Sequence, residues 1–185
     1  SGAIFLPKGH RPEGGWPVVA WAHGTVGIAD LCAPSWKGRS QRDVDYLNAW
    51  LGQGYAIVAT DYQGLGTRGT HPYIQTRPAA YSVLDAVRAA LSSKHHLANR
   101  VVVIGQSQGG GAAFATGAFQ PDYAPDIHLL GVVATGTPYI SPVTLAAALH
   151  ADPEQVDPTI AYLLYLIETA SDPAIPGQVL KDAAK

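Results

Sequence analysis

The sequence carries little charge of either sign. Charged residues make up 14% of its 185 residues, and the formal net charge is -2. Because nucleic acids and anionic surfaces are bound through basic patches, this balance predicts no nucleic-acid partner. Hydrophobic residues make up 47% of the chain, which is enough for one sizeable core and unlike the composition of a disordered protein.

Long hydrophobic runs and metal-binding spacings are also missing. The longest apolar stretches, residues 129–134 and 162–167, are far shorter than the roughly 20 residues of a bilayer-spanning helix. We therefore expect no transmembrane segment. The histidines include no H-E-x-x-H or related ligand spacing, so we expect no metal and no other cofactor.

Cys32 is the single cysteine, which excludes a disulfide within this sequence. A lone cysteine is most often a small, buried hydrophobic residue. The alternative is a disulfide to a cysteine that lies outside these residues.

Val-, Ile- and Leu-rich runs alternate with helical patterns along most of the chain. The runs predict strands at residues 3–7, 16–23, 55–61, 100–105 and 129–136. Helices are predicted at residues 40–53 and 79–93, and a third begins in the region of Ser107. This alternation favours an α/β fold with a mostly parallel sheet covered by helices on both faces. Residues 141–185 show only short helical patterns, so we expect a core over residues 1–140 and a helical cap or lid over 141–185.

The stretch GQSQG, residues 105–109, joins a predicted strand to a helix of small residues. A Gly-x-Ser-x-Gly match alone is weak evidence, but its position between strand and helix is that of a nucleophile elbow. In such an elbow the serine backbone is strained and the flanking residues pass close together, which Gly105 and Gly109 permit. Ser107 is therefore the predicted nucleophile. The glycine patterns of phosphate-binding loops are absent.

A serine nucleophile needs N–H donors for the oxyanion that forms on the substrate. One expected donor is the backbone N–H of Gln108, directly after the serine. The second is expected from the loop after an earlier strand, and we predict the N–H of Thr25; the alternative is an ordinary strand-end turn. His23 and Gly24 are predicted to shape this loop, with His23 as a structural residue and not as the catalytic base.

Three stretches together resemble the secretory lipase family of α/β-hydrolases, which includes fungal lipase A-type enzymes. They are WPVVAWAHGTVGIADLCAPS at 16–35, ATDYQGLGTRGTHPYI at 59–74 and GQSQGG at 105–110. The resemblance implies an α/β-hydrolase fold with a helical cap and export to the extracellular space or periplasm. It also implies hydrolysis of carboxylic esters or triacylglycerols, as a lipase or esterase acting through an acyl-enzyme.

The resemblance also implies roles for individual residues. It assigns the nucleophile to Ser107 and the oxyanion donors to Thr25 and Gln108. Exported members often carry the cysteine of CAPS. The resemblance therefore favours a disulfide at Cys32 about as much as a buried free thiol.

The acid and the base of a catalytic triad are not found at the expected places. In hydrolases they follow the serine, on loops after late strands. His128 precedes its strand, and the last predicted strand ends in TGTPY without a carboxylate. His71 lies before the serine and is predicted to shape a loop or line the pocket. His95 and His96 lie at a polar helix end and are expected to be solvated. Five further acids and histidines lie in the predicted cap: His150, Asp152, Glu154, Asp157 and Asp172.

We therefore expect the chain to be the N-terminal portion of a longer or nicked enzyme. A missing C-terminal segment or a companion chain would complete the sheet and the triad, because folded proteins avoid an apolar sheet edge that is left unpaired. The alternative is a domain that has lost its triad. For the function, the predicted substrate is an ester or lipid. A serine peptidase or acyltransferase on the same fold, and a non-catalytic binding domain, are the alternatives.

Overall fold

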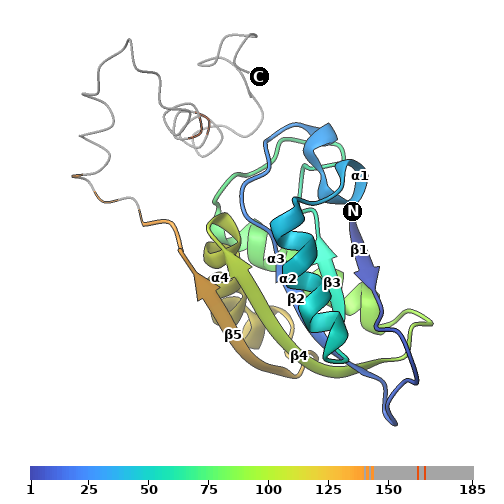
Figure 1. The fold of residues 1–185 in the computed structure, drawn as a ribbon. Helices are drawn as coiled ribbons and strands as arrows, with labels where there is room; N and C mark the ends of the chain where they lie inside the picture. Colours follow the sequence, from blue (N-terminus) through green and yellow to red (C-terminus); the bar gives the residue numbers. More distant parts are fainter. Residues whose placement is uncertain (140, 142, 144–161, 163–164, 166–185) are drawn as a thin grey trace.

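A computed structural model describes residues 1–139, 141, 143, 162 and 165 of the chain. They form a five-stranded sheet with helices on both faces (Figure 1). The strands are β1 (Gly2–Phe5), β2 (Trp16–Ala22), β3 (Ala56–Thr60), β4 (Leu97–Gln106) and β5 (Leu129–Thr135). The helices are the 3-10 helix η1 (Asp30–Cys32), α1 (Pro34–Lys37), α2 (Gln41–Gly52), α3 (Thr76–Leu91) and α4 (Gln108–Tyr123).

The strands are arranged in the order β1-β3-β2-β4-β5. β2 pairs in parallel with β3 and with β4, and β4 pairs in parallel with β5, whereas β1 is antiparallel to β3. The predicted α/β class with a mostly parallel sheet is confirmed. The carboxyl ends of β2, β4 and β5 therefore lie at one edge of the sheet, where ligands bind in folds of this kind.

The helix boundaries differ from the prediction in one informative place. α3 begins at Thr76 and not at residue 79, so that Pro78 lies inside its first turn. Proline is tolerated there because the N–H groups of the first turn have no partner within the helix. The predicted start of α2 is confirmed: the Ser40 side chain caps the helix by accepting from the Asp43 N–H (3.3 Å).

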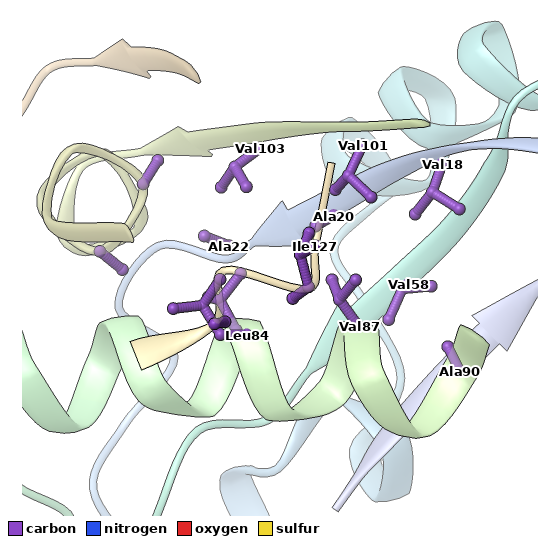
Figure 2. Packing of buried hydrophobic residues seen from close by; sticks show 14 of the residues in the cluster. Val18, Ala20, Ala22, Val58, Leu84, Val87, Ala90, Val101, Val103 and Ile127 are labelled. Atoms are coloured by element: carbon purple, nitrogen blue, oxygen red, sulfur yellow. The ribbon is translucent and has the colours of Figure 1, made fainter. Parts of the chain in front are cut away.

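Alternating residues of the strands face two separate layers of the core. One layer lies between the sheet and α3 and α4, and Figure 2 shows strand residues such as Val18, Val101 and Val103 near Leu84 and Val87 of α3. The opposite layer packs against α2 and comprises Val19, Trp21, Leu47, Ile57, Ala59 and Ile104. Because both faces are covered, the central strands are apolar on both sides, which explains the continuous hydrophobic runs in the sequence.

β5 forms one edge of the sheet within the described residues. Its side chains are less covered than those of the inner strands, with Leu130 51% and Val133 45% exposed. The predicted cap, residues 141–185, lies outside the described residues apart from Ser141, Val143, Tyr162 and Tyr165. In the part of the chain that is described, no helix is both long and apolar enough to span a bilayer.

Candidate active site

Ser107 lies in the sharp turn between β4 and α4. Its backbone has φ 58° and ψ −123°, a combination that costs a non-glycine residue about 1–3 kcal/mol and persists only where the surroundings impose it. The Ser107 N–H donates to the Thr135 carbonyl oxygen at the end of β5 (2.9 Å), and the Ser107 carbonyl oxygen accepts from the Gly111 N–H (3.1 Å). The turn is thus tied to the neighbouring strand and to its own helix.

Gly105 and Gly109 flank this turn where the backbone is crowded. A Cβ at Gly105 would overlap the Gly109 carbonyl oxygen and lie 3.0 Å from the Gly110 nitrogen. A Cβ at Gly109 would overlap the Ala22 carbonyl oxygen and lie 2.7 Å from that of His23. Since backbone atoms cannot rotate away as a side chain can, both positions have room for hydrogen only.

The loop after β2 passes directly beside Ser107. A Cβ on Gly24 would lie 3.7 Å from the Ser107 Cβ, and Thr25 is the next residue. Neither the Thr25 N–H nor the Gln108 N–H donates to another group within the described part of the chain. Within the described residues both N–H groups are therefore without an acceptor, one on the residue after the serine and one on the loop that passes beside it. Their role as oxyanion donors stays a prediction.

His71 is buried against the residue that follows the serine. Its Nδ1 lies 2.8 Å from the Gln63 carbonyl oxygen, which can only accept, so Nδ1 carries the proton. Nε2 then accepts from the Gln108 side-chain amide, 3.0 Å away. Burial lowers the pKa of His71 and so favours this neutral form. Because both ring nitrogens are engaged, His71 is not free to act as a base in this arrangement.

His23 is bound into the loop that it begins. Its Nδ1 lies 2.7 Å from the Gly24 carbonyl oxygen, and its own carbonyl oxygen accepts from the Tyr62 hydroxyl (2.9 Å). The two rings also contact each other, with centroids 4.4 Å apart. Burial lowers the pKa of His23, so the ring is neutral near pH 7. These contacts fix the loop beside Ser107.

Asp61 is a buried carboxylate that the sequence analysis did not single out. It follows β3 directly and is 0% exposed. It accepts from the backbone N–H and the hydroxyl of Ser35 and from the hydroxyl of Ser1. Asp61 therefore holds α1 against the end of β3. An acidic residue directly after a buried strand was the available signal, but its partners are distant in the sequence.

The described residues place no acid–histidine pair on the Ser107 hydroxyl, which forms no hydrogen bond with them. His128 is exposed at the amino end of β5, the opposite edge of the sheet from the serine. No group of three or more potential metal ligands occurs in the same part of the chain. The remaining candidates from the sequence lie outside the described residues: His150, Asp152, Glu154, Asp157 and Asp172.

Cys32 ends the short helix η1 as a free, half-buried thiol. Its Sγ is so close to Gly27 that a Cβ there would overlap it. Half-burial fits a packing role in this loop. A disulfide to a cysteine outside the chain stays a prediction.

One cavity of about 220 Å³ is lined by Gly105, Gln106 and Thr135, directly beside the serine turn. Two larger cavities lie in the same part of the fold. The larger, about 680 Å³, lies between β1, β3 and α3 and touches neither Ser107, Thr25 nor Gln108. The smaller, about 410 Å³, is lined by His23, Gly24 and Thr25 and by residues around the start of α2. The largest of these three cavities therefore lies away from Ser107, whereas the other two border the loop after β2 and the serine turn.

Solved structures that resemble the chain define its class. An esterase, the rice cell wall degrading LipA from Xanthomonas oryzae, is 28% identical with a TM-score of 0.59, over 75% of this chain and 38% of that one. Lipase A of Candida antarctica has a TM-score of 0.68, over 91% of this chain and 39% of that one; at 21% identity this likeness shows the fold alone. The chain has the α/β-hydrolase fold.

Sequence relatives narrow the class to one family. The family described as secretory lipase matches residues 37–153, which is more than half of the chain. Lipase 7 of Candida albicans is 32% identical over 49% of this chain, and the secreted triacylglycerol lipase LIP4 of Malassezia furfur is 34% identical over 60%. The chain belongs to the secretory lipase family. It covers only 21% and 20% of the length of these two relatives.

Proposed function

We propose that this chain carries the nucleophile and the oxyanion-binding groups of a serine carboxylic ester hydrolase. The observation that carries the proposal is the strained turn at Ser107, with φ 58° between a parallel strand and a helix. It is supported by the N–H groups of Thr25 and Gln108, which donate to no other group in the described part of the chain. Membership of the secretory lipase family supports acylglycerol-type or short-to-medium acyl esters as substrates. The relative from Malassezia furfur is named a secreted lipase, which supports an extracellular or periplasmic location for this protein.

In the proposed reaction, Ser107 Oγ attacks the ester carbonyl carbon while its proton passes to a histidine base. The carbonyl oxygen becomes an oxyanion and accepts from the Thr25 and Gln108 N–H groups, each worth about 2.7–4 kcal/mol by comparison with other enzymes. Gln108 also begins α4, so the positive end of the helix dipole favours the same charge. The bond to the alcohol oxygen then breaks, and the histidine returns its proton to that oxygen. Water cleaves the acyl-enzyme by the same steps.

The base and its acid come, in this proposal, from residues outside the described part of the chain. They would be supplied by cap or later sequence, or by a companion chain. Two observations support this. Both ring nitrogens of His71 are engaged, and His23 is 1% exposed and held by its Nδ1. The strand β5, whose Thr135 binds the serine turn, leaves Leu130 and Val133 exposed. An added strand would cover that edge and bring its carboxyl-end loop to the site.

A covalent probe tests the nucleophile in the complete protein as its gene encodes it. A fluorophosphonate should label Ser107, identified by peptide mass spectrometry. Ser107→Ala should abolish labelling and lower p-nitrophenyl ester hydrolysis by at least about 10³-fold. Ser92→Ala, at an exposed serine that ends α3, should leave both unchanged. Labelling at another residue, or full hydrolysis by Ser107→Ala, would refute the assignment.

A substrate panel separates the alternative functions. A lipase or esterase should cleave p-nitrophenyl esters and acylglycerols much faster than peptide anilides. Preference for anilides would indicate a serine peptidase, and preference for an alcohol acceptor over water would indicate an acyltransferase. A complete protein that is folded but not labelled at Ser107 would indicate a non-catalytic binding domain.

A further inference from the structure

The segment His71–Pro72–Tyr73 contacts both residues whose N–H groups are the proposed oxyanion donors. His71 Nε2 accepts from the Gln108 side-chain amide (3.0 Å). The Tyr73 hydroxyl is hydrogen-bonded to the Thr25 hydroxyl (2.8 Å). Thr25 and Gln108 lie on different elements, the loop after β2 and the start of α4, so one short segment links the two sides of the site.

We propose that His71 and Tyr73 are positioning residues that set the oxyanion geometry, His71 through the Gln108 side chain and Tyr73 through the Thr25 hydroxyl. This inference rests on the proposed function of Ser107. Neither side chain would touch the reacting atoms. Their role would be to keep the two N–H groups at the distance and angle that the tetrahedral intermediate requires, since catalysis by such donors depends on their being fixed in advance.

The need for positioning is greatest at Thr25. Its N–H belongs to a loop and not to a strand. Among the described residues, Thr25 forms one hydrogen bond, from its side-chain hydroxyl to that of Tyr73. Tyr73 itself is 7% exposed, and burial, the largest cause, raises the pKa of its hydroxyl. The hydroxyl therefore stays protonated near pH 7 and remains a hydrogen-bonding partner for Thr25.

The segment is in turn held from its other side. The His71 Nδ1 donates to the Gln63 carbonyl oxygen (2.8 Å), and the His71 carbonyl oxygen accepts from the Tyr165 hydroxyl (2.8 Å). Within the segment, the same carbonyl oxygen accepts from the Tyr73 N–H (2.9 Å). The Tyr73 ring also lies 5.2 Å from the Tyr162 ring, centroid to centroid. A segment with this many fixed contacts can transmit its position to Thr25 and Gln108.

Conservative substitutions in the complete protein test the proposed role of the hydrogen bond between Tyr73 and Thr25. Tyr73→Phe removes only the hydroxyl, Thr25→Val removes its partner, and Thr25→Ser restores that partner. We expect Tyr73→Phe and Thr25→Val each to lower kcat for a p-nitrophenyl ester about 10-fold with KM within about twofold. That loss is smaller than the 10²–10³-fold for removing a donor, because the N–H groups remain. The double variant should lose no more than either single one, and Thr25→Ser should retain most of the rate.

Binding of an alkylboronic acid gives a second measurement, because its tetrahedral adduct with Ser107 resembles the intermediate. Its Kd should rise in parallel with the fall in kcat. Tyr55→Phe, beside the amino end of β3, is the matched control and should change neither value. A purely structural role for Tyr73 would alter the unfolding midpoint but leave kcat and boronate affinity unchanged.

The outcomes separate this inference from the proposal on which it rests. If Ser107→Ala retains full hydrolysis, the proposed function fails and the inference with it. If Ser107→Ala is inactive while Tyr73→Phe keeps the wild-type kcat, only the inference fails. Additive losses in the double variant would also overturn it, because Tyr73 and Thr25 would then act separately.

Discussion

Gly109→Ala tests whether crowding, and not helix propensity, decides the first turn of α4. The added Cβ would overlap the Ala22 carbonyl oxygen and lie 2.7 Å from the His23 carbonyl oxygen. Both are backbone atoms, so β2 and α4 would have to move apart. Overpacking in a core costs about 1–3 kcal/mol where side chains can adjust, and we expect about 3 kcal/mol or more here, because these atoms cannot.

Gly111→Ala is the matched control on the same helix. Its Cβ would lie 3.7 Å from the Pro138 Cδ, an ordinary contact, and alanine is favoured over glycine in a helix by about 1 kcal/mol. Urea unfolding should therefore show a loss of stability for Gly109→Ala and a small gain for Gly111→Ala. Fluorophosphonate labelling of Ser107 should fall only in Gly109→Ala. Equal stability and equal labelling of the two variants would refute the crowding argument.

Three further changes have definite expected results. Asp61→Ala leaves the half-buried Ser35 N–H and two serine hydroxyls without their acceptor, and urea unfolding should show a loss of about 2–4 kcal/mol; an unchanged midpoint would contradict this. Burial lowers the pKa of His23 and His71 below the ordinary value of 6.5, so the stability that they contribute is complete above that pH and is lost as the pH falls below it through the lowered pKa. His71→Asn should weaken this dependence in a pH series of unfolding midpoints, while the exposed-site variant His10→Asn should not. Gln108→Glu places a carboxylate, which only accepts, at His71 Nε2, so His71 must be protonated on both ring nitrogens to keep this contact and its bond to the Gln63 carbonyl oxygen. The ratio of the variant's kcat to that of the wild type should rise as the pH falls, and a flat ratio would refute the contact.

The parts of the fold that follow from local pattern could be predicted from the sequence. Continuous apolar runs identified the five strands, because a parallel sheet covered on both faces needs them. Ser40 and Gly54 marked the ends of α2, and the structure has a capping bond at the first and a φ of 86° at the second. The turn at Ser107 was predictable because its glycines are required by the same close approach that the structure contains.

Features that depend on distant partners could not be predicted. Asp61 has a structural role because it accepts hydrogen bonds from Ser35, which lies 26 residues away in the sequence. No local sequence pattern predicts that contact. The same holds for Tyr73 and Thr25, separated by 48 residues. The short helices η1 and α1 were missed because four residues or fewer carry no periodic signal. The triad acid and base stay a prediction.

The hydrogen bond from the Ser107 N–H to Thr135, together with the approach of Gly24, has a consequence for folding. The turn is complete only when three strands from widely separated parts of the chain have paired in the correct register, and such contacts form slowly because long loops must close first. Reactivity at the serine should therefore be among the last native properties to return during refolding, after helical circular dichroism. The time course of probe labelling would then report when β2, β4 and β5 have all paired at their carboxyl ends.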